Sequence, residues 1–174
     1  MALLRGIAPS NPSMRNENLR RVAEGLGLAG VRTVISSGNV VFDSESDRDS
    51  LEQRLEAAWP EQLGFNSTSI VRSREELARL LDADPFSGFV HGPTSYLLAT
   101  FLQRPPEENQ PPDPPADRGF TVVGMVDGVV LTATDTTTTR TPDAMTWLER
   151  VYGARITSRT WKTVGRVHAA MADR

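Results

Sequence analysis

The chain has 174 residues, a length typical of one large domain or two small ones. Its formal net charge is −3, so no global positive field attracts nucleic acid or an anionic membrane. It contains no cysteine, which excludes disulfides, thiolate catalysis and cysteine-based metal sites. No apolar run approaches the ~20 residues of a membrane span, and we expect a soluble, cytoplasmic protein with no cofactor and no bound metal.

The first 72 residues have the pattern of a β-α-β-β-α-β unit. Ser50 and Gln53 have the spacing of a capping box, which marks the start of the second helix. The order of elements is typical of a ferredoxin-like antiparallel sheet, with the strands in spatial order 4-1-3-2. The expected elements are a strand over 2–7, a helix with apolar positions 19, 22, 23 and 26, a hairpin over 31–42, a helix from Ser50 to Gly64, and a strand over 68–72.

The second half repeats this pattern with one departure. Six prolines fall within residues 105–115, so the first helix of the second unit is missing. Asp127-Gly128 predicts a hairpin turn between two strands, and Thr141 with Pro142 predicts the start of a helix. The expected elements are a helix from Ser73, strands over 96–102, 120–124 and 129–134, a helix with Met145, Leu148 and Val151 facing the core, a strand over 155–158, and a helix over 160–172.

The fold class is therefore α+β, with two tandem ferredoxin-like subdomains and a C-terminal helix. The first subdomain covers residues 1–72, and 73–92 form a connecting helix and loop. The second covers 93–174 and contains the proline-rich insertion 104–117, which we interpret as a spacer.

The glycines at 25, 27 and 30 satisfy the pattern G-x-G-x-x-G but not its structural context. A dinucleotide site needs a strand before the glycines and a helix N-terminus after them. Here a helix precedes and a strand follows, which presents helix carbonyls and the negative end of the dipole. We discard the nucleotide-binding interpretation.

Several motifs together resemble a known bacterial family: Leu3-Leu4-Arg5-Gly6-Ile7, Val31-Arg32-Thr33, Ser37-Gly38-Asn39-Val40-Val41-Phe42, Ile70-Val71-Arg72-Ser73 and Thr157-Ser158-Arg159-Thr160-Trp161-Lys162-Thr163. In this order they resemble the uncharacterised family named domain of unknown function 1697, over nearly the whole chain. The resemblance implies a pair of ferredoxin-like subdomains and no particular activity. The chain departs from the family in the loop after Ile7, at Thr160 in place of Asn, and in the missing helix at the proline-rich stretch.

The first candidate site lies where strand 1 of the predicted sheet ends. In the 4-1-3-2 order this end is next to the turn of the strand 2–3 hairpin, which brings Arg5 near Ser37 and Asn39. A guanidinium beside a hydroxyl and an amide forms a plausible pocket for a small anion. The alternative is structural, with Arg5 tying down the hairpin through its carbonyls.

The second candidate site is the stretch Arg159-Thr160-Trp161 before the last helix. Thr160 is placed to cap that helix, with Thr163 near N3, while Trp161 covers a ring and Arg159 meets a charge. The alternative is a cap with the tryptophan packed on the core. The last 25 residues are basic, which either favours a local anion-binding face or simply marks a solvated helix.

The leading functional hypothesis is a binding module for a small anionic ligand seated on Arg5, Ser37 and Asn39, with Arg159 and Trp161 as further candidates. An enzyme of unknown reaction type is the alternative, although the sequence contains no recognisable nucleophile–base motif. An RNA-binding protein is less favoured, because the chain is acidic and its third strand offers one aromatic residue, Phe42.

Overall fold

The computed structural model describes residues 1–107, 110–111, 113–114, 119–137 and 142–172. These residues form an α+β structure with two four-stranded antiparallel sheets, five α-helices and one short 3-10 helix. Contacts divide the chain into two compact units, one of residues 1–75 with 166–174 and one of residues 76–165.

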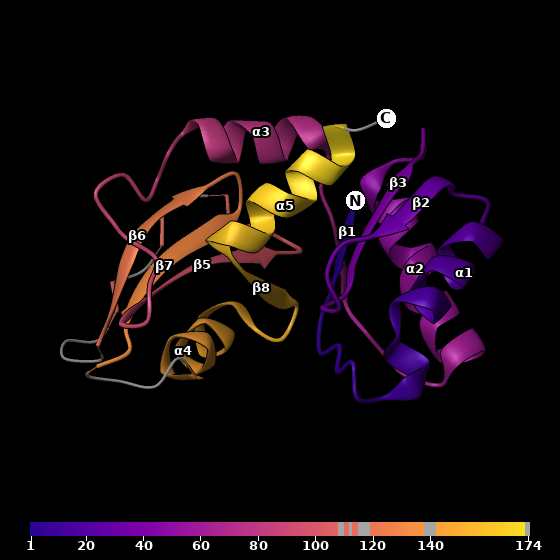
Figure 1. The fold of residues 1–174 in the computed structure, drawn as a ribbon, viewed down its shortest axis with the longest axis horizontal. Coiled ribbons are helices and arrows are strands. Elements are labelled where there is room, and N and C mark those ends of the chain that lie inside the picture. Colours follow the sequence, from indigo (N-terminus) through magenta and orange to yellow (C-terminus); the bar gives the residue numbers. More distant parts are fainter. Residues whose placement is uncertain (108–109, 112, 115–118, 138–141, 173–174) are drawn as a thin grey trace. The chain divides into compact units, whose positions relative to one another are not determined.

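The first unit contains one four-stranded sheet with two helices on one face (Figure 1). The strands lie in the order β2-β3-β1-β4, which confirms the 4-1-3-2 order predicted for this half. Its elements are β1 (Ala2–Leu4), the 3-10 helix η1 (Pro12–Met14), α1 (Asn16–Gly25), β2 (Ala29–Thr33), β3 (Asn39–Asp43), α2 (Arg48–Leu63) and β4 (Ser69–Val71).

The core of the first unit forms where the apolar faces of α1 and α2 meet one face of the sheet. Leu19 from α1 and Leu55 from α2 are fully buried among sheet residues such as Val40. Trp59 is also fully buried, and its indole N–H donates to Ser69 Oγ at 2.9 Å. The polar atom of this large side chain is therefore satisfied inside the core.

The N-cap of helix α2 lies three residues before the predicted Ser50, so the capping-box assignment is wrong. Asp47 is the N-cap, and its carboxylate accepts the backbone N–H of Ser50 at 2.9 Å. Ser50 thus occupies the third helical position rather than the cap, since aspartate caps a helix as well as serine does. The predicted end is confirmed, because Gly64 adopts a left-handed conformation and its N–H donates to Pro60 O.

Two carboxylates of α2 cover the outer edge of β4. The backbone N–H of Val71 donates to Glu52 Oε1, and that of Ser69 donates to Glu56 Oε1, both at 3.0 Å. β4 is an edge strand of the sheet. Its outward N–H groups at 69 and 71 are therefore paired within the unit rather than offered to another strand.

The second unit repeats the strand order of the first, as β6-β7-β5-β8. The Asp127-Gly128 turn between β6 and β7 is confirmed, with φ of 46° and 75°, the signs that a type I′ turn requires. Its elements are α3 (Arg74–Asp82), β5 (Ser95–Leu102), β6 (Phe120–Val126), β7 (Val129–Asp135), α4 (Pro142–Tyr152), β8 (Ile156–Thr160) and the start of α5 (Trp161–Ala172).

The buried face of α4 differs from the predicted one. Met145 and Val151 are 37% and 40% exposed, whereas Ala144 and Trp147 are buried beside Leu148. The ring of Trp147 packs on Phe120 with centroids 5.5 Å apart. Burial of the tryptophan ring removes more apolar area from water than burial of Met145 or Val151 would, so the helix turns its Trp147 side toward the core. The predicted cap Thr141 lies outside the described residues.

The described part of the proline-rich insertion contains no helix or strand. This part consists of residues 104–107, 110–111 and 113–114. α4 contributes the helix of one core cluster in the second unit, together with residues of β5, β6, β7 and β8.

Candidate functional site

The hairpin that carries Ser37 and Asn39 is held together by the side chain of Asn39. Its amide donates to Val34 O at 2.8 Å and to Ser37 Oγ at 2.9 Å. Asn39 is 0% exposed. Both donors of this amide therefore serve the turn, which is a structural role for a residue predicted to touch a ligand.

The end of β1 lies against this hairpin, as predicted from the strand order. The N–H of Leu4 donates to Gly38 O at 2.8 Å. Arg5 follows directly, and its own backbone is fixed on the other side, where its N–H donates to Thr68 O and its carbonyl accepts from Ser67 Oγ. The structure thus places the main chain at Arg5 next to the turn that contains Ser37.

Arg159 is a buried residue of β8 rather than an exposed charge. It is 8% exposed, and its guanidinium donates to Thr157 Oγ1 at 2.8 Å and to Ser158 O at 2.9 Å. Burial lowers the pKa of Arg159 to about 10, which still leaves the side chain charged at neutral pH. Both of these hydrogen bonds are made to neighbouring residues of β8, one to a hydroxyl and one to a backbone carbonyl.

Thr160 caps α5, as the sequence predicted. The N–H of Thr163 donates to Thr160 Oγ1 at 3.2 Å, and the two hydroxyls lie 2.9 Å apart. Trp161 packs edge-to-face on the buried Phe86, with ring centroids 5.1 Å apart. These contacts favour the structural alternative for this stretch, a capped helix whose first residue is packed on an apolar neighbour.

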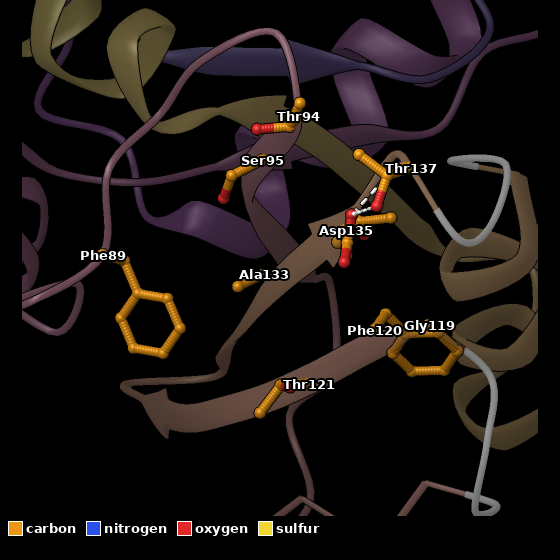
Figure 2. Close-up of a pocket in the computed structure, with 10 residues that line it drawn as sticks. Phe89, Thr94, Ser95, Gly119, Phe120, Thr121, Ala133, Asp135 and Thr137 are labelled. Carbon is orange, nitrogen blue, oxygen red and sulfur yellow. Dashed lines mark hydrogen bonds between the residues drawn. The ribbon is translucent and has the colours of Figure 1, made fainter.

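A pocket of about 690 Å³ lies in the second unit, lined by residues that were not predicted to form a site (Figure 2). It is formed by the start of β5, the start of β6 and the end of β7, together with the loop before β5. The lining residues are Phe89, Thr94, Ser95, Gly119, Phe120, Thr121, Ala133, Thr134, Asp135 and Thr137.

Strand register brings these residues together. Ser95 of β5 pairs with Asp135 of β7, and Thr121 of β6 pairs with Ala133. Because directly paired residues share one face of a sheet, short polar and small side chains gather at this end of the sheet. Figure 2 shows the ring of Phe89, from the loop before β5, at one side of this group.

Asp135 is the single ionisable residue among the described residues that line the pocket. The hydroxyl and the N–H of Thr137 both donate to Asp135 Oδ1, at 2.5 and 2.8 Å. The hydrogen bond from the Thr137 hydroxyl lowers the pKa of the Asp135 carboxyl below its usual 3.8, and the bond from the Thr137 backbone N–H adds a smaller effect in the same direction. The pocket therefore contains a fixed carboxylate at neutral pH.

Thr134 also borders the pocket, but it is 1% exposed and pairs with Tyr96 and Phe120. Because side chains alternate along a strand, its hydroxyl lies on the face of the sheet opposite Asp135.

No local motif marks this pocket in the sequence. Thr137, in the turn after β7, orients Asp135. His91 fixes the chain before β5, since its Nδ1 accepts the N–H of Leu97 at 3.2 Å. The lining residues come from three strands and a loop, and only their long-range pairing makes them neighbours.

The remaining sequence motifs lead to no site. α1 ends at Gly25 and β2 begins at Ala29, so the glycine pattern connects the end of a helix to the start of a strand. Within the described ranges, no cluster of His, Asp and Glu side chains could hold a metal ion. None of the described helices is long and apolar enough to cross a membrane.

The chain is therefore an α+β protein with two four-stranded antiparallel sheets and a pocket at one end of the second sheet. The chain belongs to the DUF1697 family of proteins of unknown function, whose model matches residues 1–117, and this confirms the resemblance noted in the sequence. It is also similar to the structure of a conserved bacterial protein from Streptococcus pneumoniae, with a TM-score of 0.70 and 17% identity, over 98% of this chain and 96% of that chain. At this identity the similarity concerns the fold alone. A comparison with curated proteins found no match.

Proposed function

We propose that this chain is a non-catalytic binding module for a small molecule, and that the pocket of the second unit is its binding site. One observation carries this proposal: a cavity of about 690 Å³ combines the exposed ring of Phe89 with several hydroxyls and one carboxylate. Small-molecule sites are typically cavities of about 300–1,000 Å³ with apolar walls and a few polar groups that orient the ligand.

The pocket is better suited to binding than to catalysis. A threonine or serine nucleophile needs an adjacent general base, and the hydroxyl of Thr137 does lie beside Asp135. An efficient base, however, has a pKa near the working pH, and the pKa of Asp135 is shifted in the opposite direction. The Asp135–Thr137 pair therefore acts as an oriented acceptor rather than as a proton-transfer pair.

A small anion at the hairpin of the first unit is the second candidate. The hydrogen bond from Leu4 N–H to Gly38 O supports it, because this bond holds the chain at Arg5 close to the Ser37 turn. If the ligand binds at this hairpin, Arg5 and Ser37 contact it, and Asn39 holds the turn through its bonds to Val34 O and Ser37 Oγ. Arg159 and Trp161 support β8 and α5 in either version.

Both versions rest on the same fold. We propose that each unit is a variant of the ferredoxin-like fold, because both sheets have the strand order of that fold. The first unit supplies both helices of the motif, whereas the described residues between β5 and β6 of the second unit contain no helix.

A thermal-shift panel tests the proposed function. The panel contains nucleotides, phosphorylated metabolites, carboxylates, amines and alcohols at millimolar concentration, because a ligand that binds only the folded state raises Tm. If the second-unit pocket is the site, a compound should stabilise the protein, Phe89→Ala should remove this stabilisation, and Arg5→Ala should leave it intact. The opposite pattern supports the anion site at the hairpin, and no stabilisation by any class contradicts both.

A further inference from the structure

The ring of Phe89 is an exposed aromatic surface in the second-unit pocket. It lines the pocket from the loop before β5, and Figure 2 shows it at one side of the lining residues. Phe89 is 42% exposed, whereas phenylalanine is usually among the most buried residue types. A phenyl ring at the wall of a pocket offers an apolar face, and a ligand that covers this face removes it from water.

A second ring, that of Phe86, holds Phe89 in place. The two rings pack edge-to-face, with centroids 6.2 Å apart and planes at 80°. The backbone N–H of Phe89 donates to Phe86 O at 2.8 Å. Phe86 itself is only 4% exposed, so Phe89 rests on a buried neighbour. The ring of Phe89 is therefore both exposed and fixed.

Trp161 connects these two rings to the sheet of the second unit. It packs edge-to-face on Phe86, with centroids 5.1 Å apart and planes at 72°. Trp161 directly follows Thr160, which pairs with Leu98 of β5 and caps α5 by accepting the N–H of Thr163. Because β5 also contributes to the pocket, the three rings join the strand that carries the pocket to the aromatic wall of that pocket.

We propose that the ligand carries an apolar ring that packs on Phe89, and that Trp161 is a positioning residue of the site, acting through Phe86. This inference rests on the proposed function, since it names a ligand class for the second-unit pocket. A wall that is fixed before binding loses less conformational freedom when the ligand arrives, which raises affinity. Affinity should therefore depend on Trp161, although Trp161 is not among the described lining residues.

Two uncharged probes test the ligand class: 2-phenylethanol and ethanol. They share the hydroxyethyl group and differ in the phenyl ring, so the comparison does not depend on charge. Dissociation constants are measured on the full chain by following the backbone amide resonances of Thr94, Thr121 and Ala133 during titration. We expect 2-phenylethanol to bind at least about tenfold more tightly, because its ring and Phe89 bury apolar area against each other. Equal binding of the two probes would exclude a ring-bearing ligand.

A double-mutant cycle with 2-phenylethanol tests the role of Trp161. Phe89→Ala removes the aromatic wall and should weaken binding about threefold to tenfold. Trp161→Leu removes the aromatic support of Phe86 and should weaken binding by about threefold, whereas Trp161→Phe keeps an aromatic ring and should cost less. In the Phe89→Ala background, Trp161→Leu should cause no further loss of affinity, because Trp161 acts through Phe89.

A merely structural role of Trp161 gives a different result in the same cycle. Trp161→Leu would then lower Tm without changing affinity, or it would weaken binding equally with and without the ring of Phe89. Either result overturns the positioning role. Phe86→Leu interrupts the row of rings at its middle, and it replaces Trp161→Leu in the cycle if that variant does not fold.

The outcomes separate the inference from the proposed function. If 2-phenylethanol shifts the pocket amides but binds no more tightly than ethanol, or if the cycle shows a merely structural Trp161, the inference fails and the pocket remains a binding site. If neither probe shifts the resonances of Thr94, Thr121 and Ala133, both the inference and the proposed function are overturned. Preference for the ring, with a loss in Trp161→Leu that disappears in the Phe89→Ala background, supports both.

Discussion

Gly38 occupies a conformation and a space that suit no other residue. Its φ is +73°, and a Cβ built there would lie 2.6 Å from Ile7 Cγ1 and 3.0 Å from Leu4 Cβ. Left-handed φ is costly for residues with a Cβ, and the clash with the chain after β1 adds to this cost. The glycine of the hairpin is therefore explained by packing, without any ligand.

Gly38→Ala should lower the free energy of unfolding by about 3 kcal/mol, the sum of strain and overpacking. Gly27→Ala is the matched control, because Gly27 has φ of +77° with no atom within 4 Å of its Cβ position. It should cost only about 1–2 kcal/mol. Urea unfolding measures both, and Ile7→Ala in the Gly38→Ala background should recover part of the loss. Equal costs at the two glycines would contradict the packing explanation.

Asp135 should contribute to stability in a manner that depends on pH. Because its folded pKa lies below its usual 3.8, the carboxylate stabilises the fold above that pH and loses this effect as pH falls through the folded value. The stability difference between the protein and Asp135→Asn should therefore stay constant from neutral pH to about pH 5 and shrink in stronger acid. Denaturant unfolding across this pH range checks it, and a change centred near neutrality would exclude Asp135 as the cause.

At the scale of elements, the carboxylates of α2 are as important as its apolar face. Glu52 is fully buried and accepts the N–H of Val71, so it pairs an edge that would otherwise be open. Carboxylates are rarely buried unless they are paired. A prediction from the hydrophobic pattern alone would therefore place Glu52 on the solvent-exposed face of the helix. The helix and the edge strand are joined by polar bonds within a buried interface.

Glu52→Ala should destabilise the protein by about 2–3 kcal/mol, because it leaves a buried N–H without its charged acceptor. Glu52→Gln keeps one acceptor oxygen and should cost less. Glu61→Ala, at an exposed position of the same helix, should change stability by less than about 0.5 kcal/mol. Urea unfolding gives the three values, and amide exchange should accelerate at Val71 in Glu52→Ala. Similar values for Glu52→Ala and Glu61→Ala would contradict the pairing role.

The elements themselves could be predicted because their signals are local. Asp127-Gly128 and Gly64 marked a turn and a helix end at the positions where the structure has them. Errors arose where two local signals competed, as between Asp47 and Ser50 at the start of α2. They arose also where tertiary packing decided, as for Trp147 over Met145 in α4.

At the scale of the whole molecule, the fold argues against recognition of RNA on the first sheet. RNA-recognition modules stack bases on exposed aromatics of their sheet. Here Phe42 of β3 is buried in the core of the first unit, and Val40 and Val41 beside it are fully buried. The net charge of −3 supplies no compensating attraction.

The protein should therefore retain no single-stranded RNA above background in filter binding at about 50 mM salt, where phosphate contacts are strong. A ferredoxin-like RNA-binding domain at the same concentration serves as the positive control. Retention that weakens steeply as salt rises would contradict this expectation and revive the RNA hypothesis.

The closeness of the chain at Arg5 to the hairpin was predictable, whereas the pocket of the second unit was not. The strand order alone placed Arg5 beside the hairpin, since that order follows from the sequence of elements. The pocket depends on which residue of β5 pairs with which residue of β7, and on a loop that presents Phe89. Neither the register nor the loop has a signal in a single stretch of sequence.

We place the ligand in the second-unit pocket, and an amide chemical-shift map of the full chain tests this location most directly. The titrated compound is whichever member of the thermal-shift panel stabilises the protein most. We predict that the perturbed amides cluster at Thr94, Thr121, Ala133 and Asp135, and that Phe89→Ala reduces these shifts. Perturbations confined to Leu4, Arg5 and Gly38, with the amides of the second-unit pocket unchanged, would contradict binding in that pocket.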